Sequence, residues 1–399
     1  MKTDTSCDIL VIGGGPAGST AAYLLASYGY EVILVDRKHF PRPKLCAGLL
    51  TWKSIGLIRS IFHLSPGELA AKGLITHQTN NYRVFFKTSQ IADGCLDYPF
   101  HFVERSAYDH YFFQAAVRAG ARTITGQAVR HVDPAAGVAA LSGGIRIRAR
   151  TIIGADGAAS RTRRSILTSH KAIQHWKNQL AVTVETLLAL PKGHPPQEFA
   201  ALYFGFVPWG YAWSFPSRDG RIVGIASLWR KGDRSARESF ERFKATIGFS
   251  GAPIQPLGSH PLPMGNYLDP PGRHRVLLVG DACGLADPLL GEGIYYAHRS
   301  AQIAARSIIQ SAPGSMDLQR TYRRLMTRHL FRELRWIRAY RNMLHLGGAR
   351  RRYRGLALFL RVLPKRLEAA VQGQMPFAGL LQPFAHRRSR TKNGLYSED

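Results

Sequence analysis

The chain has 399 residues, of which 45% are hydrophobic and 20% charged, and 54 Lys and Arg stand against 26 Asp and Glu. This composition excludes a chain disordered throughout, and the net charge of +28 favours anionic partners such as phosphorylated molecules or anionic lipid surfaces. No apolar run reaches the roughly 18 residues of a transmembrane helix and no signal peptide is visible, so we expect a cytoplasmic protein, at most peripheral on the inner face of the membrane.

The first elements form a β-α-β pattern. A buried strand is expected at Cys7–Ile12, a helix at Pro16–Tyr28 and a second strand at Glu31–Val35. The later pattern predicts a helix at Tyr108–Ala119, strands at Gly126–Asp133 and Gly144–Ile153, short strands with turn residues over about 170–263, a strand in RVLLVGDA, and a helix at Ile294–Gln310.

A dinucleotide fingerprint lies between the first strand and the first helix. Gly13, Gly15 and Gly18 match G-x-G-x-x-G, which provides a tight turn, close approach to a diphosphate and close helix packing. Pro16 and Ala17 open the helix, whose free N–H groups attract phosphates. Asp36 ends the second strand and is placed to bind an adenosine ribose, as in FAD or NAD. A glycine-rich connection followed by a surface Asp is the alternative.

Two later segments, containing Ala155–Gly157 and Gly280–Asp281, distinguish FAD from NAD. VERSAYD (103–109), ARTIIGADGAASRTRR and RVLLVGDACGLADPLLGEGIYYAHRSAQIAA resemble flavoproteins of the p-hydroxybenzoate hydroxylase type. The resemblance implies FAD, with Asp281 on the ribityl chain and the backbone around Gly291–Ile294 at the flavin pyrimidine end. An N-cap role is the alternative for Asp281. The remaining residues expected at the cofactor are Arg37, Lys44, Cys46, Ala47, Arg105, Val129, Asp156, Gly157, Glu292, Gly293 and Ile294.

The expected fold class is α/β, with a Rossmann-type FAD-binding domain, an inserted antiparallel-sheet substrate domain and a helical C-terminal tail. The FAD-binding domain is expected at 1–165, with a small insertion at about 70–100, and again at 271–315. The antiparallel substrate domain is expected at 166–270, and a basic, mostly helical region at 316–399.

Within this group the sequence most closely resembles the geranylgeranyl reductase family. The carrying segments are Pro41–Gly48, Val207–Ser227 with its GYAWSFP run, and Asp287–Ala297. The resemblance implies reduction of isolated C=C bonds in isoprenoid chains, and it makes Cys46 the candidate catalytic group that donates or relays a proton. A packed thiol is the alternative for Cys46. Ala47 stands where the family usually has Gly, which leaves the substrate open.

An aromatic stretch suggests a lipid-shaped pocket. Its residues are expected to line the substrate site or, equally, to fill the core of a sheet. The predicted pocket residues are Tyr203, Phe206, Trp209, Tyr211 and Trp213.

Half of the net positive charge lies in the last fifth of the chain. Residues 317–399 carry nineteen Lys and Arg against five Asp and Glu, a net +14. A basic amphipathic helix suits an anionic membrane surface, with a solvated charged face as the alternative. No nucleic-acid fold motif accompanies the charge, so nucleic acid is not the expected partner. The basic clusters are Arg323–Arg341 at intervals of three to four residues, Arg350–Arg352, and Arg387–Arg390.

Two other functions fit the same scaffold. A flavin monooxygenase or halogenase is the main alternative, although Phe215 and the position of Trp209 depart from the halogenase W-x-W-x-I-P pattern. A non-catalytic membrane-bound flavoprotein is the other. The four cysteines fit no zinc pattern, so no metal is expected. The electron donor is left open among NADPH, NADH and ferredoxin, since no second fingerprint is present.

Overall fold

The computed structural model describes residues 4–167, 169–178, 180–189, 197–218, 220–228, 235–250, 258–345 and 349–381. The chain divides into two compact units, and each is made of three separate stretches of sequence. The first unit comprises Met1–Cys46, Glu104–Ala181 and His260–Arg332, and the second comprises Ala47–Val103, Val182–Ser259 and Glu333–Asp399.

The first unit is built on a mostly parallel sheet. Its strands lie in the order β15 (Gly272–Arg273), β16 (Val276–Leu278), β9 (Arg146–Gly154), β1 (Asp4–Ile12), β2 (Val32–Asp36) and β6 (Arg122–Thr125), and the hairpin of β7 (Val129–Asp133) and β8 (Val138–Leu141) joins at β9. Ile9, Leu10 and Val11 are fully buried, which is typical of a parallel strand covered on both faces.

The strand register brings four turns to one edge of this sheet. Strands β16, β9, β1, β2 and β6 run parallel, with Val11 beside Leu34 and beside Ile153. The chain therefore leaves β1 at Gly13, β2 at Asp36, β9 at Ala155 and β16 at Val279 on the same side. Ligands of open α/β sheets bind at this carboxyl edge.

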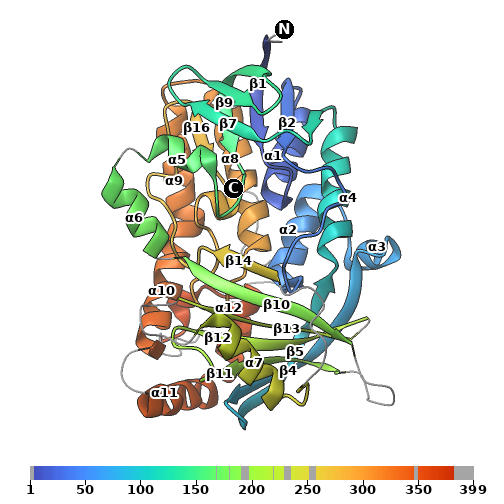
Figure 1. Ribbon diagram of the computed structural model, residues 1–399, viewed down its shortest axis with the longest axis vertical. Coiled ribbons are helices and arrows are strands. Elements are labelled where there is room, and N and C mark those ends of the chain that lie inside the picture. The colour runs from blue at the N-terminus through green and yellow to red at the C-terminus, as the bar shows by residue number, and fades with distance from the viewer. Residues whose placement is uncertain are drawn as a thin grey trace, which may run out of the picture. The chain divides into compact units, whose positions relative to one another are not determined.

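Helices pack on both sides of the first sheet (Figure 1). Helix α1 packs against α4 and α8, and α5 packs against β7 and β16. The helices of this unit are α1 (Pro16–Ser27), α4 (Arg105–Arg118), α5 (Arg161–Ile166), α6 (His170–Asn178), α8 (Ile294–Ser311) and α9 (Leu318–Met326), with a 3-10 turn η1 (Gly280–Ala282) and a π-helical turn η2 (Thr327–Phe331). Strand β14 (Gly258–Leu262) leads the chain back into this unit.

The second unit contains a mostly antiparallel sheet. In spatial order its strands are β14, whose first two residues belong to this unit, β10 (Ala181–Ala189), β13 (Gly220–Ser227), β12 (Gly210–Ser217), β11 (Phe199–Phe204), β4 (Ile75–Phe86), β5 (Ser89–Val103) and β3 (Leu49–Leu50). From β10 to β3 the β11–β4 pair is parallel and the other pairs are antiparallel. Helices α2 (Trp52–Phe62) and α3 (Pro66–Ala71) connect β3 to β4.

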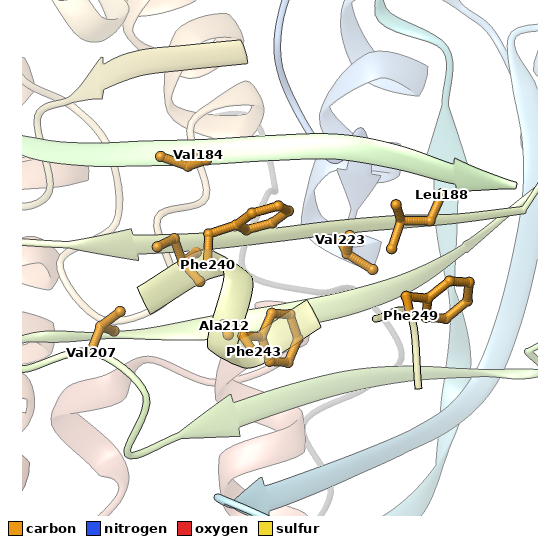
Figure 2. Packing of buried hydrophobic residues seen from close by; sticks show 9 residues of the cluster. Val184, Leu188, Val207, Ala212, Val223, Phe240, Phe243 and Phe249 are labelled. Carbon is orange, nitrogen blue, oxygen red and sulfur yellow. The ribbon is translucent and has the colours of Figure 1, made fainter. Parts of the chain in front are cut away.

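One face of this sheet is covered by helix α7 (Ala236–Thr246). A capping box at Ser235 and Glu238 starts the helix, because each of these residues accepts a hydrogen bond from the backbone N–H of the other. Figure 2 shows Phe240 and Phe243 projecting from α7 into the cluster formed with Val184, Leu188, Ala212 and Val223. Both Phe side chains are fully buried, and each contributes about 1.5–3 kcal/mol by leaving water.

The opposite face of the same sheet meets the C-terminal helices. These are α10 (Arg332–His345), α11 (Ala349–Val362) and α12 (Pro364–Gln372), followed by the turn η3 (Phe377–Gly379). Leu356 and Leu360 of α11 pack against Val84 and Ile91, and the Tyr82 hydroxyl donates a 2.8 Å hydrogen bond to Glu368 of α12. Helices α10, α11 and α12 are therefore part of the second unit.

The main elements of the first unit agree with the sequence predictions within about three residues, but the division of the chain differs. The insertion expected at 70–100 covers 47–103, because β3, α2 and α3 also belong to the second unit. Helices α6 and α7 interrupt the region expected to hold only short strands. The region expected as one block from 316 is split, since α9 stays in the first unit. Arg387–Arg390 and the side chains of Arg350–Arg352 lie outside the described residues.

Candidate active site

The turn after β1 has the close backbone packing that the fingerprint requires. Gly13 has a φ of +106°, and a Cβ atom on Gly18 would lie 1.7 Å from the Gly13 carbonyl oxygen. Glycine is therefore needed where α1 approaches β1. At Gly15 such a Cβ would meet a guanidinium nitrogen of Arg42 at 3.5 Å and, apart from neighbouring backbone, no other described atom within 4 Å. Gly15 thus faces space that a diphosphate can occupy.

The start of helix α1 suits an anion. In the described part of the chain no side chain caps this end, Pro16 occupies the first turn, and the first turn holds no acidic residue. The positive end of the helix dipole therefore favours an anion there. Asp36 holds the turn from the neighbouring strand: its Oδ2 accepts the Gly14 N–H at 2.7 Å and its Oδ1 accepts the Lys38 N–H at 2.9 Å. Each carboxylate oxygen keeps a lone pair for a ribose hydroxyl.

Arg42, which the sequence did not single out, lies over this turn. Its guanidinium is 3.9 Å from the Asp36 carboxylate and 3.6 Å from the carboxylate of Asp109. It also lies 4.8 Å from the centre of the Phe40 ring, which stacks on Phe113 at 4.3 Å. A half-buried guanidinium held in this way is suited to bidentate contact with phosphate oxygens.

A buried ion pair fixes the second charged group of the site. The Arg105 guanidinium donates two hydrogen bonds to Asp109, at 2.9 and 3.0 Å, and both side chains lie on α4. Arg105 also hydrogen-bonds the Cys46 side chain. Burial by itself lowers the pKa of Arg105, but Asp109 and Cys46 together outweigh burial and raise that pKa. Arg105 thus stays charged beside the Cys46 sulfur.

Lys44 and His260 lie in the same cluster. Nζ of Lys44 lies 2.7 Å from Nε2 of His260, within hydrogen-bond distance. Burial lowers the pKa of Lys44, and the opposing charge of Asp281 offsets part of this effect. Burial, followed by the Lys44 charge, lowers the pKa of His260. Lys44, Cys46, Arg105 and His260 therefore form one interacting cluster, to which Asp281 contributes negative charge.

Asp281 adjoins the start of helix α8. A Cβ atom on Gly293, the N-cap of α8, would lie 3.6 Å from Oδ1 of Asp281, and no side chain caps this helix. Buried Asp287 shapes the preceding turn by accepting the N–H groups of Leu289 and Leu290, both at 2.7 Å. No hydrogen bond to the Asp281 carboxylate occurs in the part of the chain that the structure describes. The N-cap alternative thus has no support there, and the carboxylate is available to a polyol.

Asp156 has the capping role instead. Its carboxylate accepts hydrogen bonds from the Ser160 hydroxyl and from the N–H groups of Arg161, at 2.8 Å, and Thr162, at 3.1 Å. It therefore holds the first turn of α5. Gly157 has a φ of +75° and no neighbour within 4 Å of a Cβ position, so its surface is open. Val129 is buried at the start of β7.

The predicted pocket residues belong to the second unit and divide between two faces of its sheet. Tyr203 and Phe206 pack into the cluster under α7, so they serve the core of that face. Tyr211 and Trp213 point to the opposite face, where their rings lie 5.9 Å apart and Phe215 continues the row at 6.4 Å. Gly224 makes room for the Trp213 ring, since a Cβ there would lie 2.2 Å from it. Trp209 is half-buried at the start of this strand.

Comparison with known proteins agrees with this geometry. A model of the family described as "FAD binding domain" matches residues 6–325. The chain belongs to the FAD binding domain family. Members of this family bind FAD, and the open Gly15 turn, the Asp36 and Asp281 carboxylates and the uncapped start of α8 fit that cofactor. The protein is thus an FAD-dependent oxidoreductase by family.

Relatives within and around this family have several activities. A geranylgeranyl diphosphate reductase of Rhodobacter capsulatus is 30% identical over 78% of each chain, and a menaquinone reductase of Mycobacterium tuberculosis is 29% identical over 82% of this chain and 81% of its own. A tryptophan 2-halogenase of Chondromyces crocatus is 28% identical over 84% of this chain and 67% of its own. A geranylgeranyl bacteriochlorophyll reductase-like protein of Thermoplasma acidophilum has the same fold, with a TM-score of 0.74 at 21% identity over 87% and 89% of the two chains.

Three residues of the site were missed by sequence reasoning. Arg42 carried a signal, since it lies in the basic stretch before Cys46. Asp109 carried a weaker one, four residues after Arg105 on a predicted helix. His260 carried none, because only the chain path brings β14 to Lys44.

Proposed function

We propose that this flavoprotein reduces isolated C=C bonds in an isoprenoid chain, such as a geranylgeranyl or polyprenyl group. The observation that carries the proposal is the contact between Arg105 and Cys46, in a cluster that also contains Asp281. Reduction of an unpolarised alkene needs a proton donor held close to the reacting carbons. A thiol against a charged guanidinium meets that need, because the cation stabilises the thiolate left behind.

Bound FAD supplies the hydride in this reaction. The protein contributes the remaining steps. Arg42 and the start of α1 would hold the diphosphate, Asp36 would hold the ribose, and Asp281 would hold the ribityl chain. Tyr211, Trp213 and Phe215 form a row of buried aromatic rings in the second unit, and the chemistry of such a row would suit a hydrocarbon chain.

The experiment is reduction of geranylgeranyl diphosphate by the purified FAD-loaded chain, with NADPH, NADH or reduced ferredoxin supplied in separate reactions. Mass spectrometry should detect the addition of one H₂ for each double bond reduced. The Cys46→Ser variant should lose turnover by at least tenfold while keeping its flavin absorbance. The matched control is Cys95→Ser, because Cys95 is exposed and outside the cluster. A chain that binds FAD and leaves every prenyl substrate unchanged would instead be a non-catalytic flavoprotein.

A monooxygenase or halogenase is the second candidate, favoured by the 28% identity to a tryptophan 2-halogenase. It predicts rapid oxygen consumption that an electron-rich substrate stimulates, with an oxygen or halogen atom in the product. The reductase predicts saturation of the prenyl chain without such an atom. The same mass spectra distinguish the two products.

We also propose that the C-terminal helices rest on an anionic lipid surface. Among the residues that the structure describes, four of the ten exposed large apolar side chains lie on these helices: Trp336 and Met343 of α10, and Leu358 and Val362 of α11. Exposed Arg361 lies between the last two. Apolar side chains beside arginines suit the boundary between head groups and acyl chains. No helix in the described part of the chain is long and apolar enough to cross a bilayer.

A further inference from the structure

Lys44 and His260 form a second titratable pair beside Cys46. They come from distant parts of the first unit, since Lys44 precedes Cys46 by two residues and His260 lies on β14. Nζ of Lys44 and Nε2 of His260 lie 2.7 Å apart, so when Lys44 is charged its ammonium donates and Nε2 carries no proton. The two basic nitrogens, Nζ of Lys44 and Nε2 of His260, therefore share one titratable proton.

The surroundings make that proton easier to release. The largest effect on both groups is burial, which lowers the pKa of Lys44 and the pKa of His260. Arg105 acts in the same direction on both, and the negative charge of Asp281 opposes it. Asp109 and the Cys46 sulfur also raise the pKa of Lys44. These groups face the pair from α4, from η1 and from the segment before Ala47.

Arg105 and the Lys44–His260 pair can act on Cys46 in different ways. Arg105 is held in a bidentate ion pair with Asp109 and cannot give up a proton in a protein, so it stabilises the thiolate only by charge. Lys44 carries a charge that also acts on Cys46, and it can be deprotonated. Lys44 is thus a proton source within the cluster that can restore the thiol.

We infer that Lys44 and His260 form a proton reservoir that reprotonates Cys46 in every turnover. The inference rests on the proposed function. The S–H bond of Cys46 breaks as a C–H bond forms on the alkene carbon that does not receive the hydride. An N–H bond of Lys44 then breaks to restore the thiol. Water returns a proton to the pair through half-buried His260, so no further co-reactant is needed.

The first test measures alkylation of Cys46 by iodoacetamide as a function of pH. It uses a Cys95→Ser background, since Cys7 and Cys283 are buried. Lys44→Met should raise the pH of half-maximal alkylation by about 1 unit, because the thiolate loses a neighbouring positive charge. Lys171→Met is the matched control, an exposed lysine of the same unit, and should leave that pH unchanged. Both FAD-loaded and FAD-free full chains are measured, so loss of cofactor does not remove the readout.

The second test separates proton supply from structure. His260→Gln keeps an acceptor for Lys44 but removes the second base, so the alkylation profile should stay as in the parent. Its kcat should fall by about tenfold or more, and the solvent deuterium isotope effect on kcat should increase, because proton return becomes rate-limiting. The KM for the prenyl substrate should be unchanged.

The outcomes distinguish this inference from the function on which it rests. An unchanged alkylation profile in Lys44→Met, or full kcat with the parental isotope effect in His260→Gln, overturns the reservoir while reduction by the parent chain stands. A parent chain that reduces no alkene removes the proposed function, and with it the reservoir, even where Lys44→Met shifts the alkylation profile.

Discussion

A hydrogen bond of 2.8 Å joins the Tyr108 hydroxyl to Nε2 of His298 in the interior of the first unit. Nδ1 of the same imidazole lies 2.6 Å from the Thr20 hydroxyl. The three side chains come from α4, α8 and α1, and all are fully or almost fully buried. Burial lowers the pKa of His298 to about 3, so the imidazole is neutral and bridges the three helices.

This bridge predicts a pH dependence of stability. The folded pKa of His298 is about 3 and the usual value is 6.5. The unfolded chain therefore binds a proton below pH 6.5 that the folded chain excludes, and stability falls as the pH drops from 6.5 towards 3. His298 contributes up to about 1.4 kcal/mol per pH unit to this loss. Urea unfolding at several pH values should show a shallower decline for His298→Leu than for the parent.

The same variant should be less stable at pH 7.5. Leucine fills similar space but leaves the Thr20 and Tyr108 hydroxyls without their partner, at about 1–3 kcal/mol each. Tyr108→Phe, which removes one hydroxyl and leaves one ring nitrogen without its hydrogen bond, should cost less than His298→Leu. Equal stability of parent and His298→Leu at pH 7.5 would show that the Thr20–His298–Tyr108 bridge does not stabilise the fold.

The fingerprint glycines should respond differently to added methyl groups. At Gly15 a Cβ meets only the flexible end of Arg42, so Gly15→Ala should fold and lose FAD affinity by about tenfold, because the methyl occupies the diphosphate space. At Gly18 the Cβ would collide with backbone, so Gly18→Ala should lower the thermal midpoint of the apoprotein as well. Flavin fluorescence titration and thermal unfolding of the FAD-free chains measure the two effects. Equal affinity in Gly15→Ala would place the diphosphate elsewhere.

The sequence predicted the first unit more fully than the second, for a physical reason. Local signals define a β-α-β unit: the apolar run before Gly13, the helix start at Pro16 and the acid at Asp36 all lie within thirty residues. The grouping of 47–103 with the C-terminal helices depends on contacts such as Leu356 with Val84, which no local pattern encodes. The site shows the same contrast. Arg105 and Cys46 lie in recognisable motifs and were predicted, whereas His260 reaches the site only through the tertiary structure.

The Arg105–Asp109 pair should be costly to break. Asp109→Asn leaves a buried guanidinium without its carboxylate, and unfolding free energy should fall by about 3–5 kcal/mol. Asp317→Asn is the matched control, since it breaks an ion pair with Arg320 in which both side chains are exposed, and no measurable change is expected. Denaturant unfolding of the two variants compares them directly, and similar losses would mean that burial does not determine the value of the pair.

Membrane contact through α11 should depend on both apolar and basic groups. The side chains of Leu358 and Val362 are 63% and 62% exposed, one helical turn apart. The double variant Leu358→Ser/Val362→Ser should bind vesicles of phosphatidylglycerol and phosphatidylcholine at least tenfold more weakly than the parent, because two apolar side chains no longer leave water. Leu187→Ser is the matched control, an exposed leucine on β10, and should bind as the parent does. Binding should weaken as salt is added and vanish on pure phosphatidylcholine, since the arginines act through charge. Equal sedimentation of parent and double variant with the anionic vesicles would assign the arginines to a solvated surface and remove α11 from any lipid contact.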